Sequence, residues 1–132
     1  MEGTGRLGGK LFGTEKLTRL GSYLEKRGIS LKVGDEYLPP GYAGGFSADE
    51  KSLVLRSEPT NYEVWHELIH YQQYRSLGEE AYSAQTRLLK EQHVFDKLES
   101  MPKRWESLTP EQIGHARWYI DKVGGGYGNG YF

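Results

Sequence analysis

Three leucines recur at the three- and four-residue spacing of one helix face between Thr14 and Gly28. Thr14 has the side chain of a helix N-cap, and Gly28 is of the type that ends helices. The next stretch, ISLKVG from Ile29, alternates apolar and polar residues as a half-buried strand does. The pattern therefore predicts a helix from Thr14 to about Gly28, followed by a strand.

The middle of the chain predicts a loop, a second strand and a long helix. The prolines and glycines of DEYLPPGYAGGF are typical of a turn-rich loop, and KSLVLRS, from Lys51, is typical of a short strand. Thr60 and Glu63 have the spacing of a capping box, which marks a helix start. We expect this helix to continue to about Leu77 and to stop at Gly78.

The last third predicts two more helices. One runs from about Glu80 to Glu99, and the other begins after Thr109, with proline at the first helical position, and ends at Gly124. The core stripe of the latter consists of Ile113, Ala116, Ile120 and Val123. The resulting order predicts an α+β fold, in which a short β-sheet packs on the helix after Thr60 and further helices follow.

The composition fits one small domain. The chain has 132 residues, of which 36% are hydrophobic and 13% aromatic, which is enough for a single modest core. We expect a linker-like segment over residues 1–13, a folded domain over residues 14–124 and a flexible glycine-rich tail over residues 125–132.

The charge and the cysteine content limit the kinds of partner and of metal site that the chain can have. The net charge is −1 with acids and bases interspersed, so a nucleic-acid-binding or membrane-binding surface gains no support. No stretch is long and apolar enough to insert into a membrane, and we expect a monomer. Because the chain has no cysteine, any metal must be held by His, Asp or Glu.

The sequence HELIH lies within the helix predicted after Thr60. His66 and His70 leave the same helix face one turn apart, which lets two ring nitrogens reach one zinc ion at about 2.0–2.1 Å. Zinc lowers the pKa of a bound water to about 7, and Glu67 stands where it can take the proton of that water. We predict one Zn²⁺ per chain. The alternative is that neighbouring groups satisfy the hydrogen-bonding needs of the two histidines and that Glu67 is exposed to solvent.

The third ligand is expected from the following helix. The extended motif HExxHxxGxxH fails, because glutamine and serine stand where it requires glycine and the last histidine. Glu91 falls in an apolar stripe, where a carboxylate is costly unless it is paired, and zinc would pair with it. His93, which faces about 200° away, and Asp96 are the alternatives. Without a metal, Glu91 would pair with an arginine such as Arg87.

Transition-state stabilisation is assigned to the last predicted helix. His115 is the leading candidate to donate a hydrogen bond to the oxyanion, and Tyr119 is the second. Packing among aromatic residues is the alternative role for His115. Asp121 is a candidate acceptor that would orient a histidine ligand.

An extended peptide substrate is expected to pair with the strand KSLVLRS through backbone hydrogen bonds. Gly44 and Gly45, in the loop before that strand, would permit close backbone approach.

Four segments together carry a resemblance: LPPGYAGGF, YEVWHELIHYQQYRSLGEEAY, LLKEQHVFDKL and RWESLTPEQIGHARWYI. On these segments, which span roughly Leu38 to Ile120, the chain resembles the zincin-like metallopeptidase toxin domains of bacterial polymorphic toxin systems. The resemblance implies a zincin-like fold, Glu67 as general base and zinc on His66, His70 and Glu91. An aromatic residue is expected where His93 stands, so a ligand at that position stays open.

Such domains form the C-terminal tip of a large secreted protein. The resemblance therefore implies a zinc metalloendopeptidase of the gluzincin type, delivered into the cytoplasm of a target cell, with a protein or peptide substrate. In the producing cell, an immunity protein would neutralise it. The alternatives are a housekeeping or processing zinc peptidase, and a non-catalytic binding module that retains the fold.

Overall fold

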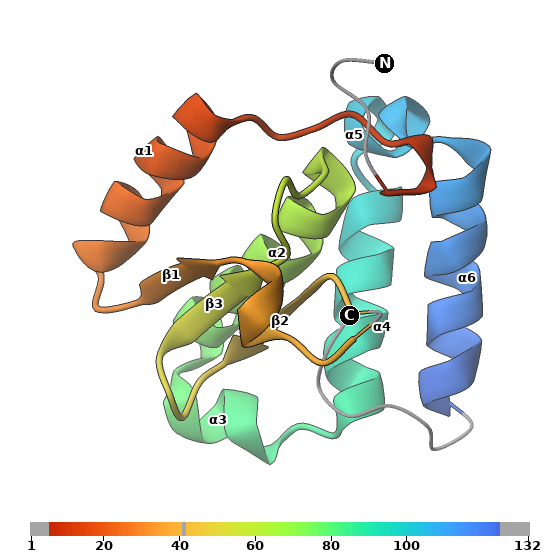
Figure 1. Cartoon of the computed structure of the whole chain (residues 1–132). Coiled ribbons are helices and arrows are strands. Elements are labelled where there is room, and N and C mark those ends of the chain that lie inside the picture. The colour runs from red at the N-terminus through yellow and green to blue at the C-terminus, as the bar shows by residue number, and fades with distance from the viewer. Residues whose placement is uncertain (1–5, 41, 125–132) are drawn as a thin grey trace.

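The computed structural model describes residues 6–40 and 42–124. This part of the chain contains one three-stranded sheet and six α-helices, so the α+β fold class is confirmed (Figure 1). Two short 3-10 helices, labelled η, complete the described elements. In chain order the elements are η1 (Arg6–Gly8), α1 (Thr14–Glu25), β1 (Ser30–Val33), η2 (Asp35–Tyr37), β2 (Gly44–Ser47), β3 (Ser52–Leu55), α2 (Asn61–Leu77), α3 (Glu79–Ala84), α4 (Arg87–Glu99), α5 (Pro102–Ser107) and α6 (Pro110–Gly124). Within the same residues, no helix has the length and apolar character needed to cross a bilayer.

The sheet has the order β1-β3-β2, with β1 parallel and β2 antiparallel to β3. The strand β2 was predicted as part of a loop, and that prediction is wrong. The sequence of β2, GGFS, has no alternation of apolar residues, and it becomes a strand by pairing Gly44 with Leu55 and Ser47 with Ser52. A strand made by non-local pairing leaves little trace in its own sequence.

The position of β3 changes the expected substrate contact. KSLVLRS was expected to pair with a peptide, but β3 within it is the central strand and is hydrogen-bonded on both sides. That prediction is wrong, because the backbone groups of a central strand are already used. The strand beside the pocket described below is β2.

Helix α2 begins as predicted. The Thr60 hydroxyl accepts a hydrogen bond from the Glu63 amide at 3.3 Å, and the Glu63 carboxylate accepts one from the Thr60 amide at 2.8 Å. These two bonds form the complete capping box. The helix ends at Leu77 before Gly78, whose φ of 87° suits glycine.

Other helix boundaries differ from the predictions. Thr14 is the first residue of α1 and not its N-cap, since Gly13 occupies the cap position. The helix predicted from Glu80 to Glu99 is two helices, because the chain turns at Gln85 and Thr86 caps α4 through the Leu89 amide. Helix α5 was not predicted. Helix α6 agrees with the prediction, including a reciprocal cap between Thr109 and Gln112.

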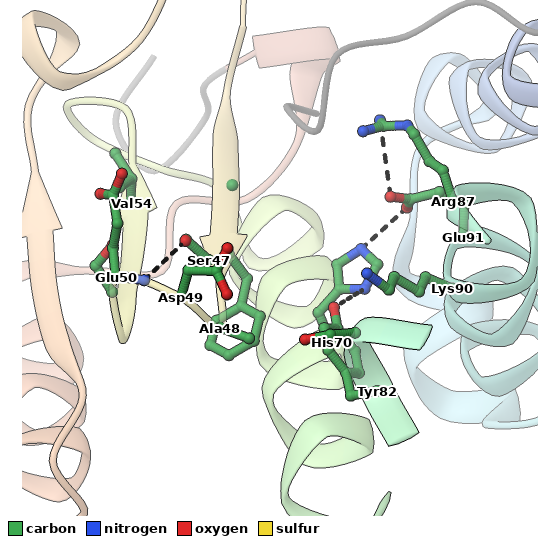
Figure 2. Close-up of a pocket in the computed structure, with 14 residues that line it drawn as sticks. Ser47, Ala48, Asp49, Glu50, Val54, His70, Tyr82, Arg87, Lys90 and Glu91 are labelled. Carbon is green, nitrogen blue, oxygen red and sulfur yellow. Dashed lines mark hydrogen bonds and ion pairs between the residues drawn. The ribbon is translucent and has the colours of Figure 1, made fainter. Parts of the chain in front are cut away.

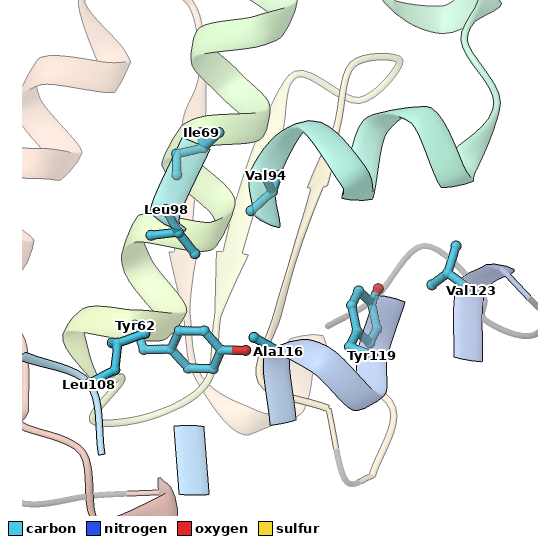
Figure 3. Close-up of a cluster of buried hydrophobic side chains, with 8 residues drawn as sticks. All are labelled: Tyr62, Ile69, Val94, Leu98, Leu108, Ala116, Tyr119 and Val123. Carbon is cyan, nitrogen blue, oxygen red and sulfur yellow. The ribbon is translucent and has the colours of Figure 1, made fainter. Parts of the chain in front are cut away.

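Two apolar clusters meet at α2, which places this helix at the centre of the molecule. One cluster joins α2 to α4 and α6 (Figure 3). It consists of Tyr62, Ile69, Val94, Leu98, Leu108, Ala116, Tyr119 and Val123. The other joins α2 to α1 and the sheet, and it consists of Leu20, Leu24, Ile29, Leu53, Leu55, Val64 and Tyr71. Because α2 is covered on both sides, its HELIH segment lies in the interior.

The segment before α1 contacts the rest of the chain. The Thr109 hydroxyl donates to the Leu7 carbonyl at 2.7 Å, and the Phe12 amide donates to the Pro59 carbonyl at 2.9 Å. The division into a linker-like segment, a domain and a tail stays a prediction, and the tail of residues 125–132 lies outside the described residues.

Candidate metal centre

Two histidines of α2 and one glutamate of α4 converge in the interior. The Nε2 atoms of His66 and His70 lie 2.9 and 3.0 Å from the same oxygen, Oε1 of Glu91, and all three residues are buried. The i,i+4 spacing places both rings on one face of α2. Helix α3 then reverses the chain, so that α4 returns against α2 with Glu91 facing the rings. The structure thus brings together the three residues that the sequence predicted as ligands.

The donor set of this cluster suits a metal ion. One ligand atom from each residue can be chosen so that all three lie within 4.8 Å of one another. Two imidazoles and one carboxylate form the protein ligand set of catalytic zinc in one group of peptidases. Ligand atoms around a tetrahedral zinc ion at about 2.0–2.1 Å are separated by about 3.3 Å, so small movements would admit the ion. Zinc binding by these residues stays a prediction.

The alternative ligands do not lie at the cluster. His93 is half-buried on α4 outside the group of three, and Asp96 is exposed and accepts a hydrogen bond from Gln92 at 3.0 Å. Arg87 is 3.7 Å from Oε2 of Glu91, the carboxylate oxygen that the histidines do not contact. Glu91 therefore faces both the histidines and the arginine that the sequence offered as its alternative partner.

Burial and charge favour the protonation states that bind metals. Burial lowers the pKa of His66 to about 4, so this ring is neutral at physiological pH. Burial alone would raise the pKa of Glu91, but the nearby His70 and His66 rings outweigh that effect and lower it. A neutral imidazole and an ionised carboxylate can bind a cation without first losing a proton.

Glu67 lies beside the cluster with one oxygen unused. Its side chain is buried, and within the described residues Oε2 has no hydrogen-bond partner. Burial, reinforced by the charge of Glu91, raises the pKa of Glu67 well above its usual range. A buried carboxylate oxygen without a partner is costly, and its position on the side of the metal ligands suits a group that accepts a proton from water.

Gly44 leaves the room that Glu67 occupies. A Cβ atom at Gly44 would lie 3.0 Å from Oε2 and 3.1 Å from Cγ of Glu67, and 3.0 Å from the carbonyl oxygen of Val54. The glycines of this segment were expected to admit the backbone of a substrate, whereas in the structure Gly44 lies against Glu67. The role of Gly44 was not predicted, because it depends on the pairing of β2 with β3.

Tyr119 contacts the cluster, and His115 contacts Tyr119. The ring of Tyr119 meets the ring of His66 edge to face with centroids 5.7 Å apart, and its hydroxyl accepts a hydrogen bond from Arg87. His115 stacks on Tyr119 at 6.1 Å, and its Nδ1 shares a hydrogen bond of 2.9 Å with the Tyr62 hydroxyl. The catalytic roles expected for both residues stay predictions.

Tyr82 is a neighbour of the site that the sequence did not indicate. Its hydroxyl lies 3.4 Å from Nδ1 of His70, on the side of the ring away from Glu91. Such a contact orients a ligand histidine. Asp121, which was expected in that role, is exposed on α6. No spacing rule pointed to Tyr82, because α3 and α4 were predicted as one helix.

A pocket of about 470 Å³ leads to the cluster between β2 and α4 (Figure 2). His70 and Glu91 form part of its inner wall, and Tyr82, Arg87 and Lys90 continue that wall. The opposite wall comes from β2 and the turn that follows it. The pocket gives a substrate access to two of the three candidate ligands.

Comparison with known proteins finds a match to a protein family. The sequence model of a protein family described as "Metallopeptidase toxin 4" matches residues 4–125. No curated protein and no solved structure matches the chain. The matched range contains every residue of the candidate metal centre.

Proposed function

Because the chain belongs to the metallopeptidase toxin 4 family, we propose that this metallopeptidase toxin domain is a zinc-dependent endopeptidase and the C-terminal effector of a secreted bacterial toxin. One observation carries the proposal. Two buried histidines and a buried glutamate converge beside Glu67, a further buried carboxylate with an unused oxygen. A core that only had to be stable would not gather four ionisable side chains in this way.

His66, His70 and Glu91 would hold the metal, and their donor types fit zinc. When bound, zinc supplies a Lewis acid that polarises a carbonyl and makes water more acidic. Arg87 holds the second oxygen of Glu91, which keeps the first oxygen directed at the histidines. Tyr82 fixes the ring of His70 from its other nitrogen.

Glu67 is the general base in this proposal. Its raised pKa brings its proton affinity closer to that of the water from which it takes a proton. After the attack on the peptide carbonyl, the same carboxyl group would deliver the proton to the leaving amine. The unused Oε2 atom is the position at which the proton is held.

Tyr119 is the proposed donor to the oxyanion, with His115 stacked on it. Arginine is only a hydrogen-bond donor, so the Tyr119 hydroxyl accepts from Arg87 and stays protonated in that contact. Burial raises the pKa of Tyr119, which keeps that proton in place. His115 contributes by holding the Tyr119 ring through the stacking contact.

The proposed biological role follows from the family. We infer that the domain is delivered into the cytoplasm of a competing cell, where it cleaves a protein, and that the producer carries an immunity protein. Expression of the chain in a bacterial cytoplasm tests this directly. Wild type should arrest growth, while Glu67→Gln should not arrest growth and should still bind about one zinc per chain.

A matched control distinguishes the loss of the catalytic carboxylate from the loss of one negative charge. Glu99 is exposed at the end of α4, so Glu99→Gln removes the same charge away from the site and should arrest growth like wild type. Growth arrest by Glu67→Gln equal to that by wild type would refute the catalytic role. Absence of zinc from purified wild type would refute the metal centre.

A further inference from the structure

Two cations stand beside the candidate ligands on the inner wall of the pocket. Arg87 and Lys90 lie one turn apart in α4, and Lys90 directly precedes Glu91. Figure 2 shows both cations on the α4 side of the pocket, with Asp49 and Glu50 on the opposite side. The wall nearest the metal centre is therefore positive.

The location of these cations is unfavourable for the helix. They occupy the first turn of α4, where the helix dipole favours acidic side chains, and this turn contains no acid. Each cation there opposes the helix dipole. Arg87 has an ion pair with Glu91 and a hydrogen bond to Tyr119, whereas Lys90 has no carboxylate partner among the residues that the structure describes.

Lys90 is held toward the pocket without a carboxylate partner. Its ammonium lies 4.5 Å from the centre of the Tyr82 ring, and within the described residues no carboxylate forms an ion pair with it. The side chain is half-buried, so its charge is screened less by solvent than that of a fully exposed lysine. A ligand with a negative charge would give this ammonium its partner.

We propose that this wall is an anionic subsite: the enzyme cleaves peptides with an aspartate or glutamate next to the scissile bond, and Lys90 binds that carboxylate. The subsite shares His70 and Glu91 with the metal centre, so a side chain within it belongs to a residue adjoining the reacting carbonyl. This inference rests on the proposed peptidase function and adds its substrate class.

The acidic residues of the opposite wall do not reverse this preference. Asp49 and Glu50 are exposed in the turn between β2 and β3, where water and salt screen their charges. Lys90 is less exposed and adjoins a candidate ligand of a divalent cation, which adds positive charge to the same wall. The stronger field therefore comes from the α4 side.

Mapping of cleavage sites tests the subsite. Zinc-loaded wild type, Lys90→Glu and Lys90→Gln are incubated with a mixture of peptides from a bacterial proteome, and new termini are identified by mass spectrometry. Wild type should favour Asp or Glu at one position beside the cut. Lys90→Glu should cut those peptides about tenfold more slowly or less and should favour Lys or Arg at that position. Lys90→Gln should lose the acidic preference without gaining a basic one.

Lys97→Glu is the matched control, because Lys97 is exposed on the same helix and does not line the pocket. It should keep the wild-type preference. A second measurement is independent of turnover: affinities of the Glu67→Gln variant for two labelled peptides that differ only by Glu or Gln at the favoured position. The Glu peptide should bind about tenfold more tightly, and addition of Lys90→Glu should remove that difference.

Three results would overturn the subsite: cleavage by wild type without acidic preference, an acidic preference that survives Lys90→Glu, or an equal shift in Lys97→Glu. Absence of cleavage by zinc-loaded wild type would instead overturn the peptidase function, and the subsite with it. The two failures are therefore distinguishable.

Discussion

The apolar cluster between α2 and the sheet and the candidate metal centre between α2 and α4 are equally buried but chemically opposite. The side toward the sheet packs apolar residues such as Leu53, Leu55 and Val64, all of them fully buried. The side toward α4 carries, beside an apolar cluster of its own, His66, His70 and their partner Glu91 at exposures of about 5%. Apolar burial stabilises the fold at about 25 cal/mol per Å², whereas burial of ionisable groups opposes folding unless they find partners.

Stability and function therefore depend on different buried side chains. Removal of a side chain on the sheet side should destabilise the chain and leave the metal centre's chemistry intact. Removal of an ionisable side chain on the α4 side should abolish function at little cost to the metal-free fold. Substitutions in the two regions test that division.

Glu67→Gln should lower the peptidase rate constant by about 10²–10⁴-fold, because the general base is lost.

The metal-free form of Glu67→Gln should be at least as stable as metal-free wild type, measured by denaturant unfolding. The raised pKa of Glu67 means that the folded state keeps a proton that the unfolded state releases above pH 4.5. Wild type should therefore lose stability relative to Glu67→Gln as the pH rises above that value. A stability difference between the two proteins that narrowed with rising pH would contradict the raised pKa of Glu67.

Leu53→Ala should lower the free energy of unfolding by about 2–5 kcal/mol, because it opens a cavity in the cluster between α1, α2 and the sheet. Urea unfolding monitored by circular dichroism measures the change. The folded fraction of the variant should still bind one zinc per chain. Zinc loss without any loss of stability would break the division between the two sides.

Glu91→Ala should weaken zinc affinity by about 100-fold or more, since it removes a direct ligand. His93→Ala, two residues later on the same helix, should change the affinity by less than about threefold. Competition with a chelating dye gives both values. The reverse result would move the third ligand to His93.

Gly44→Ala should lower the peptidase rate by about tenfold while zinc stays bound, because the new methyl group displaces the Glu67 carboxylate. Gly114→Ala is the control. A Cβ atom at Gly114 meets nothing within 4 Å, and this change should stabilise α6 by about 0.5–1 kcal/mol with unchanged activity. Equal rates in Gly44→Ala and wild type would show that Glu67 does not need this space.

Tyr82→Phe should produce the smallest effect, a weakening of zinc affinity by about tenfold or less. The hydroxyl is 3.4 Å from His70, which is long for a hydrogen bond, so the orienting contact is weak. Tyr23→Phe, on the exposed surface of α1, is the control and should not change the affinity. Equal affinities for Tyr82→Phe and wild type would remove Tyr82 from the site.

The features predicted from the sequence are those with local signals. The capping box at Thr60 fixed the start of α2, and the placement of Glu91 in an apolar stripe singled out the carboxylate that meets both histidines. Features set by non-local contacts were missed. Strand β2 exists only through its pairing with β3, and the contacts of Gly44 with Glu67 and of Tyr82 with His70 follow from the tertiary fold.

A crystal structure of the zinc-loaded chain, with the ion located by anomalous scattering at the zinc edge, tests the metal centre directly. We predict one zinc ion bound by Nε2 of His66, Nε2 of His70 and a carboxylate oxygen of Glu91, with Glu67 beside it and unbound. Zinc at any other set of residues, or no zinc at this cluster at saturating concentration, would contradict the account.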